Sequence, residues 1–114
     1  MKRPSTTRKG RAAEARAAAV LTALGYRIIA RNLRAPGGEI DLVCIEGSSL
    51  VFIEVKCRAG RTYGSALAAV DARKRRRIRA VAEDYAQILA PEARIRFDIV
   101  AIDGNRTTVH RNAF

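Results

Sequence analysis

Two stretches of the chain have the composition and spacing of amphipathic helices. Residues 10–24 are rich in alanine and lack proline, and Gly25 follows as a helix stop. The second stretch begins after Asp71, a favourable N-cap, and runs to about Ala90, where Pro91 ends it. The apolar side chains expected on the buried face of the first helix are Ala17, Val20, Leu21 and Leu24.

Between and after these helices, apolar and polar side chains alternate with the two-residue period of strands. The predicted strands are Tyr26–Asn32, Glu39–Glu46, Leu50–Cys57, Arg94–Ile102 and a short fifth at Thr107–Arg111. A loop is predicted at Pro36-Gly37-Gly38, and residues 58–70 are expected to be irregular. The element order α-β-β-β-α-β(-β) predicts an α/β fold in which helices flank a mixed sheet.

The chain has the length of one domain. Its 114 residues suffice for a single modest core. Residues 1–9 are polar and basic and are expected to be a disordered arm, whereas residues 10–114 form a single domain. The N-terminus carries no apolar signal segment, and no apolar run approaches the roughly 18 residues that cross a membrane. A soluble, cytoplasmic protein is therefore expected.

The second and third strands are joined across Gly47-Ser48-Ser49 as a hairpin, and each is charged at one end of one face. On the third strand Val51, Ile53, Val55 and Cys57 oppose Leu50, Phe52, Glu54 and Lys56. On the second strand Ile40, Leu42 and Cys44 oppose Glu39, Asp41, Val43 and Ile45. A solvent-facing surface would be polar throughout, so charge confined to the end far from the turn indicates a site.

Asp41 and Glu54 face one another directly only if the hairpin turn has two residues, such as Gly47-Ser48. A three-residue loop without a bulge would place Asp41 opposite Val55 and separate the carboxylates. In the first register, two ionised carboxylates about 4 Å apart would repel by about 4 kcal/mol at an effective dielectric of about 20. A cation must offset this repulsion, or one carboxyl group must hold a proton.

Lys56 lies two positions from Glu54 on the same face and supplies part of the positive charge. A hard divalent cation held by Asp41 and Glu54 would supply the rest, and oxygen-only ligation favours Mg²⁺ or Mn²⁺. Such an ion polarises a phosphodiester and activates water, while Lys56 orients the water or steadies the developing charge. The competing interpretation of Glu54 and Lys56 is an exposed cross-strand ion pair.

Two further acids are candidates for the same site. Glu39 precedes Asp41 by two residues on its face of the strand. Glu14 lies three residues before Ala17 on the apolar stripe of the first helix, where a carboxylate is costly unless a cation meets it. Exposure at the edge of the helix is an equally good interpretation of Glu14.

The net charge of +11, from 22 Lys and Arg against 11 Asp and Glu, favours a polyanionic partner. Nucleic acid is the first candidate and an acidic membrane surface or protein the second, although GC-rich coding also enriches Arg and Ala. The side chains expected to contact a nucleic-acid backbone are Arg58, Arg61, Arg73, Lys74, Arg76 and Arg77.

Three other polar residues have structural interpretations. Cys44 and Cys57 are expected to be buried free thiols, and a zinc site is disfavoured because His110 is the one histidine. Asp98 lies among apolar neighbours in a predicted strand, which favours a structural hydrogen bond over catalysis.

Two segments carry a resemblance to a known family. Gly38-Glu39-Ile40-Asp41-Leu42-Val43 and Val51-Phe52-Ile53-Glu54-Val55-Lys56-Cys57-Arg58 resemble the YraN-like family of uncharacterised bacterial proteins. That family is similar to Holliday-junction resolvases with the restriction-endonuclease-like PD-(D/E)xK fold. The resemblance implies that Asp41 and Glu54 are metal ligands, Lys56 the catalytic lysine, and Glu14 and Glu39 supporting acids. Ile40 replaces the signature proline before the first acid, and Arg75 stands where relatives often have Gln.

Three hypotheses follow for the function. The first is a Mg²⁺- or Mn²⁺-dependent endonuclease acting on DNA, branched or single-stranded. Resolvase-like action would require a symmetric homodimer, which the sequence neither shows nor excludes. The second is a nuclease fold that binds nucleic acid without cutting it, and the third is an adaptor for an acidic protein.

Overall fold

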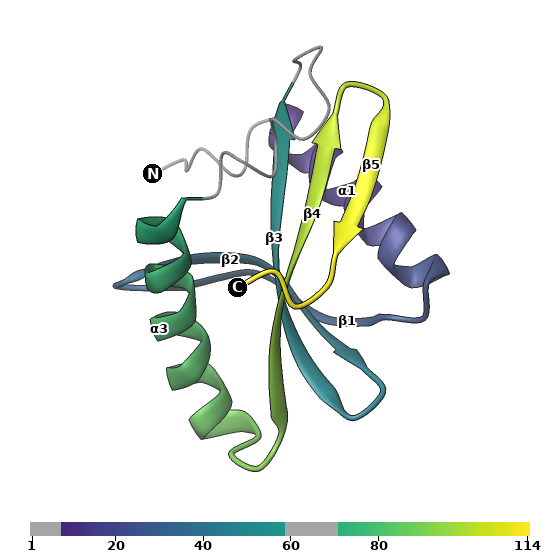
Figure 1. Ribbon diagram of the computed structural model, residues 1–114. Coiled ribbons are helices and arrows are strands. Elements are labelled where there is room, and N and C mark those ends of the chain that lie inside the picture. The colour runs from purple at the N-terminus through teal and green to yellow at the C-terminus, as the bar shows by residue number, and fades with distance from the viewer. Residues whose placement is uncertain (1–7, 59–70) are drawn as a thin grey trace.

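The computed structural model describes residues 8–58 and 71–114, which form one five-stranded sheet and two helices (Figure 1). The elements are α1 (Arg8–Ala23), β1 (Arg27–Ala35), β2 (Gly38–Glu46), β3 (Ser49–Arg58), α3 (Ala72–Leu89), β4 (Arg94–Asp103) and β5 (Arg106–His110). The strands lie in the order β1-β2-β3-β4-β5, with β3 and β4 parallel and the other pairs antiparallel. The predicted element order and mixed sheet are confirmed. Helix α1 begins two residues before the predicted start, and residues 1–7 of the predicted arm lie outside the described residues.

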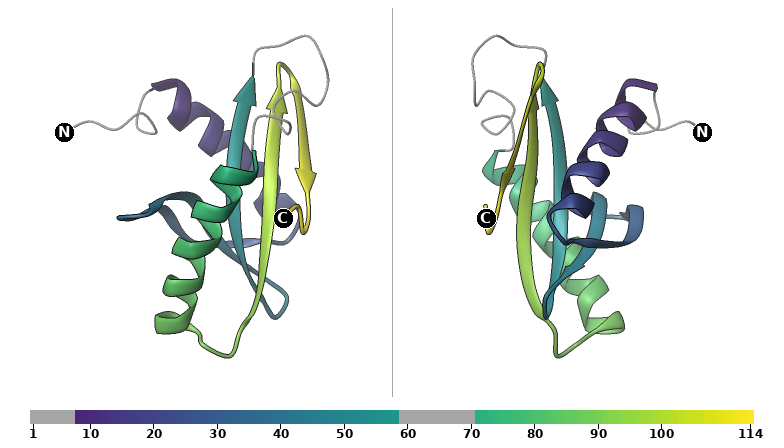
Figure 2. Two further views of the ribbon diagram at one scale, coloured as in Figure 1. Left: turned by 60° about the vertical axis from the view of Figure 1, so that its left-hand side comes forward. Right: turned by 90° about the vertical axis from the view of Figure 1, so that its right-hand side faces the viewer.

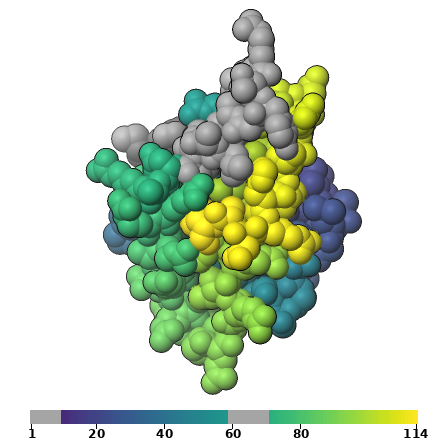
Figure 3. Space-filling model, in the orientation of Figure 1, coloured from purple at the N-terminus to yellow at the C-terminus, as the bar shows by residue number. Residues whose placement is uncertain are grey.

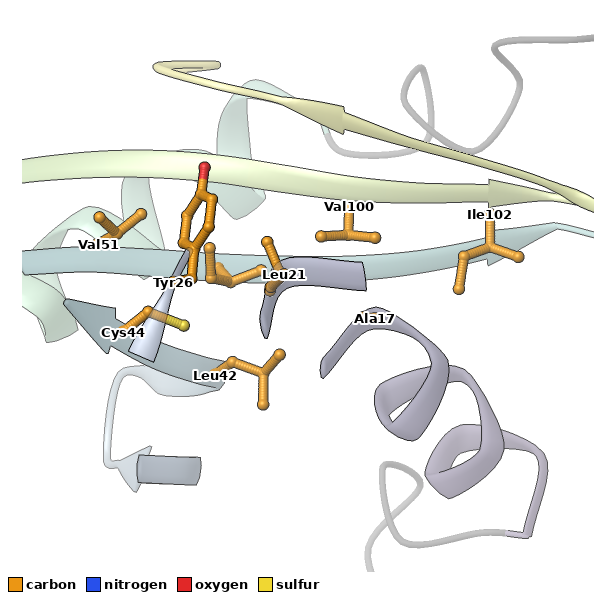
Figure 4. Packing of buried hydrophobic residues seen from close by; sticks show 9 residues of the cluster. Ala17, Leu21, Tyr26, Leu42, Cys44, Val51, Val100 and Ile102 are labelled. Atoms are coloured by element: carbon orange, nitrogen blue, oxygen red, sulfur yellow. The ribbon is translucent and has the colours of Figure 1, made fainter. Parts of the chain in front are cut away.

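The helices cover opposite faces of the sheet (Figure 2). Ala17 and Leu21 of α1 pack in one cluster with Leu42, Val51 and Val100 of the sheet, as the close view shows (Figure 4). Ile78, Val81, Ala82 and Ala86 of α3 pack in another, with Phe52 and Phe97 at its centre. Each helix buries one stripe because its apolar residues recur at three- and four-residue spacing.

One position predicted for the buried face of the first helix is wrong. Leu24 is 50% exposed, whereas Ala18 is buried. The helix ends at Ala23, and Gly25 adopts φ +98°, so the chain turns away before Leu24 can continue the buried stripe. The strand that follows runs three residues beyond the predicted end, because the pairing of β1 with β2 continues to Ala35 and Gly38.

The β2–β3 hairpin has the register required to oppose the two acids. Glu46 pairs with Ser49 across Gly47-Ser48, and the pairing continues to Leu42 with Ile53, so Asp41 and Glu54 are next in register. Gly47 has φ +62°, a conformation that favours glycine at the first turn position. The predicted two-residue turn is confirmed.

Beyond Leu42, β2 departs from β3. The pairing of the two strands ends at Leu42 and Ile53, and the start of β2 runs towards α3 in Figure 1. Ile40 therefore packs in the α3 cluster with Val43, although strict alternation predicts it beside Leu42. The turn between β1 and β2 lies against α3: a Cβ added at Gly37 would stand 3.5 Å from Cγ2 of Val81.

The two cysteines differ in exposure. Cys44 is buried as predicted, but Cys57 is exposed, which contradicts the prediction of two buried thiols. Cys57 lies near the end of β3, where the strand is paired with β4 after its pairing with β2 has stopped. Within residues 8–58 and 71–114, no helix is both long enough and apolar enough to cross a membrane.

Asp98 of β4 is fully buried and heavily hydrogen-bonded, so the predicted structural hydrogen bonding is confirmed. Its carboxylate accepts from Tyr26 Oη at 2.6 Å, from Arg96 at 3.0 and 2.9 Å, and from the Asn112 backbone N–H at 2.8 Å. Arg96 also pairs with Glu46 at 2.9 Å. This network joins Tyr26, just before β1, and Glu46 of β2 to β4 and to the C-terminal segment.

Candidate functional site

A cleft of about 520 Å³ brings together all five residues predicted to be catalytic. They are Glu14, Glu39, Asp41, Glu54 and Lys56. The cleft is formed by the first half of α1, the start of β2, the end of β3 and the start of α3. Because β2 departs from β3 after Leu42, the hairpin opens at its charged end and its acids line a cavity.

Asp41 is held at the point where the β2–β3 pairing ends. Its Oδ2 accepts a hydrogen bond of 2.7 Å from the Val55 backbone N–H. A carboxylate oxygen therefore satisfies a β3 donor at the point where the strand pairing stops, and the Asp41 carboxyl group also hydrogen-bonds the Glu54 side chain. This contact fixes the Asp41 side chain beside Glu54.

Glu54 is 3% exposed and is paired with a lysine from α3. Lys74 Nζ lies 2.5 Å from Glu54 Oε2. Lys56 lines the same cleft, but among the described residues the ion pair of Glu54 is with Lys74. The exposed cross-strand ion pair between Glu54 and Lys56, which was the competing interpretation, is therefore not what the structure shows.

Glu14 points inward from α1. It is 8% exposed, which decides between its two interpretations in favour of the inward-facing one. The side chain of Asn32 hydrogen-bonds the Glu14 carboxylate, and Asn32 has φ 54°, a left-handed conformation that asparagine tolerates. Asn32 is a site residue that the sequence interpretation missed. The sequence feature that could have indicated it is the position of an asparagine at the end of the predicted strand Tyr26–Asn32.

The site holds more negative charge than its surroundings neutralise. Burial and the neighbouring Glu54 raise the pKa of Asp41 well above its usual value. Burial also raises the pKa of Glu54, against the opposing effects of Lys74 and Lys56. The pKa of Glu14 is raised by burial and by Glu39, although the hydrogen bond from Asn32 opposes the shift. Such a cluster retains protons or attracts a cation.

We expect these shifts to make the metal-free protein less stable as pH rises. In the folded state the three carboxyl groups keep their protons to higher pH than in the unfolded chain, which releases them near about pH 4. The folded state then binds more protons than the unfolded state, and the free energy of unfolding falls from about pH 4 upward through the raised pKa values. Asp41→Asn should flatten this fall and raise the free energy of unfolding by about 1–2 kcal/mol in mildly alkaline buffer.

Urea denaturation across the pH range, in the presence of EDTA, measures this effect. Glu83→Gln is the matched control because Glu83 is an exposed acid on α3. An Asp41→Asn variant whose unfolding free energy falls with pH as steeply as that of the wild type would contradict the prediction.

The donor set fits a hard divalent cation only in part. Asp41 and Glu54 offer carboxylate oxygens, and Mg²⁺ is commonly held by one or two carboxylates together with water and substrate phosphate. Across the described part of the chain, no three His, Cys, Asp or Glu side chains converge closely enough to form a ligand group. A cation here would rely on water or phosphate for its remaining ligands.

The predicted nucleic-acid contacts divide into three groups. Lys74 and Arg77 line the cleft. Arg58, Arg73 and Arg76 are exposed, and Arg61 lies outside the described residues. Arg75 contacts the C-terminal segment: its guanidinium donates to the Ala113 carbonyl at 3.5 Å and lies 5.6 Å from the Phe114 ring centre. Figure 3 shows this segment against α3.

The model of the uncharacterised protein family UPF0102 matches residues 13–102. The chain belongs to this family. The resemblance to the YraN-like family is thereby confirmed. A UPF0102 protein of Dechloromonas aromatica is 46% identical over 110 residues, covering 96% of this chain and 91% of the relative. A UPF0102 protein of Symbiobacterium thermophilum is 49% identical over 113 residues, with 94% and 96% covered. The match runs from within α1 to near the end of β4 and thus includes every described residue of the cleft except Gly10.

Proposed function

We propose that this UPF0102 protein is a divalent-metal-dependent endonuclease that hydrolyses phosphodiester bonds in DNA, with branched or single-stranded DNA as the preferred substrate. The observation that carries the proposal is the pair of hydrogen-bonded carboxyl groups of Asp41 and Glu54, with Lys56 two residues further along β3 in the same cleft. The resemblance to Holliday-junction resolvases and the PD-(D/E)xK fold supports the same chemistry.

The side chains divide the work of hydrolysis. Asp41 and Glu54 would hold Mg²⁺ or Mn²⁺, which when bound polarises the phosphodiester and lowers the pKa of a water molecule. Lys56 is half-buried and lines the cleft, so its ammonium can orient the attacking water and stabilise charge that develops on phosphate. Asp41 is kept in place by the Val55 backbone N–H, and Glu14 by Asn32.

The surrounding charge supports a nucleic-acid substrate. The chain carries +11 overall, and Arg77 and Lys74 line the acidic cleft while Arg58, Arg73 and Arg76 are exposed on β3 and α3. Such contacts attract the phosphate backbone irrespective of base sequence, and binding should weaken steeply as salt rises. Paired cuts at a four-way junction would further require two copies related by symmetry.

Cleavage of labelled duplex, single-stranded and four-way-junction DNA tests the proposal. We expect cleavage with Mg²⁺ or Mn²⁺, none with EDTA, and none by the Asp41→Asn/Glu54→Gln double variant, which removes both anionic ligands with little change in volume. Cleavage by the double variant would identify a contaminating nuclease. Absence of cleavage of all three substrates under every metal condition would reject hydrolysis of DNA.

A binding module without catalysis is the second candidate. It is favoured by the ion pair of Lys74 with Glu54, because an ammonium group already neutralises one acid without any metal. Under this alternative the protein binds DNA with the same affinity in Mg²⁺ and in EDTA and never cuts it. The binding and cleavage measurements on the same samples distinguish the two.

A further inference from the structure

Lys74 reaches Glu54 from a fixed point on α3. Its backbone N–H donates a hydrogen bond of 2.9 Å to Oδ1 of Asp71, the N-cap residue of the helix. The start of the Lys74 side chain is therefore anchored, while its ammonium lies 2.5 Å from Glu54 Oε2. The Lys74 side chain is 33% exposed and that of Glu54 is 4% exposed. Lys74 thus spans from solvent to the base of the cleft.

This ion pair occupies a carboxylate that the proposed function assigns to a metal. A buried carboxylate needs a counter-charge, and Lys74 supplies it in the structure. A divalent cation bound by Glu54 would lie close to the ammonium, and like charges at that range repel strongly. The two cations therefore compete for the same oxygen atoms.

We propose that Lys74 is an exchangeable counter-ion of Glu54, displaced when a divalent cation binds and then free to contact a phosphate group of the nucleic acid. This inference rests on the proposed function for the identity of the metal ligands. The Lys74 side chain is flexible beyond its anchored backbone, so its ammonium can move along the cleft wall towards Arg77 without any change in the helix. Metal binding and phosphate binding are thereby coupled through one side chain, and each favours the other.

Lys56 does not act as an exchangeable counter-ion of Glu54. It lies on β3 two residues from Glu54, and the ion pair that Glu54 forms within the described part of the chain is with Lys74. The two lysines accordingly divide their roles: Lys56 remains beside the reacting phosphate, and Lys74 exchanges.

Mn²⁺ titration without nucleic acid tests the exchange, with free Mn²⁺ followed by electron paramagnetic resonance. Lys74→Met should bind Mn²⁺ about fivefold or more tightly than the wild type, because the competing ammonium is gone. Arg77→Met is the matched control: it removes one positive charge from the same cleft, but the ion pair of Glu54 is formed by Lys74 and not by Arg77. Its Mn²⁺ affinity should change by about twofold or less.

A second arm measures DNA binding in EDTA by fluorescence anisotropy of a labelled oligonucleotide. Glu54→Gln should bind DNA about threefold or more tightly than the wild type, since Lys74 is no longer held. The Glu54→Gln/Lys74→Met double variant should lose this gain. Circular dichroism checks the fold of each variant, and Lys74→Gln replaces Lys74→Met if the latter does not fold.

Equal or weaker Mn²⁺ binding by Lys74→Met, or an equal gain in Arg77→Met, would overturn the exchange. Absence of Mn²⁺ binding in every variant would overturn both the exchange and the proposed metal site. Tighter Mn²⁺ binding by Lys74→Met without cleavage of any DNA would support the exchange and reject only the proposed hydrolysis.

Discussion

Asp41→Ala and Glu54→Ala are each expected to lower the rate of metal-dependent DNA cleavage at least about a thousandfold. Each substitution removes one of the two opposed carboxylates at the open end of the β2–β3 hairpin. Each carboxylate would hold the cation, and both the activation of water and the neutralisation of phosphate charge depend on that cation. Single-turnover cleavage at saturating Mg²⁺ measures the chemical step without interference from product release.

Three further variants serve as controls for this prediction. Lys56→Ala should cost about a hundredfold in rate, because one cationic group is lost while the metal ligands remain. The Asp41→Ala/Glu54→Ala double variant should be no worse than the poorer single variant, since residues that act as one unit are not additive. Glu83→Ala, an exposed acid on α3, should cleave at the wild-type rate. Retention of more than about a tenth of the rate by either single variant would contradict the assigned roles.

Asp98→Ala is expected to lower the free energy of unfolding by about 3–5 kcal/mol. The substitution leaves three donors without their acceptor: the Tyr26 hydroxyl, the Arg96 guanidinium and the Asn112 backbone N–H. Because Asp98 is fully buried, water cannot easily replace the lost carboxylate. Urea denaturation of the variant and of the wild type gives the difference.

The ionisation of Tyr26 provides an independent check on this network. Burial and the Asp98 carboxylate raise the pKa of Tyr26 to about 12. In Asp98→Asn, which keeps the shape but removes the charge, the pKa of Tyr26 should fall, as ultraviolet titration of the tyrosines would show. A loss of stability under about 1 kcal/mol in Asp98→Ala, or an unchanged Tyr26 titration, would mean that the network is not coupled as the distances indicate.

The elements and the hairpin register could be predicted from the sequence because both depend on local patterns. Alternation of apolar residues marked β2 and β3 and left two turn lengths open, of which the two-residue Gly47-Ser48 turn, the one that brings Asp41 to Glu54, is the one observed. The proximity of the two acids follows from alternation together with the two-residue turn. Glu39 and Lys56 follow by two-residue spacing on the same strands.

The remaining features depend on contacts between distant segments. The approach of Lys74 to Glu54 joins α3 to β3, and the hydrogen bond of Asn32 with Glu14 joins β1 to α1. Strand alternation also fails for Ile40, because β2 leaves the plane of its partner after Leu42. This bend arises from packing of β2 against α3, and the residue period of a single strand does not predict such a contact.

Mn²⁺ binding tests most directly whether Asp41 and Glu54 form a divalent-cation site. Titration of the full chain should show saturable Mn²⁺ binding in the wild type and in Glu83→Gln. In Asp41→Asn and in Glu54→Gln, we expect the affinity to be at least about tenfold weaker. Mn²⁺ binding of wild-type strength in both of these variants would contradict the proposed metal site and the hydrolysis that depends on it.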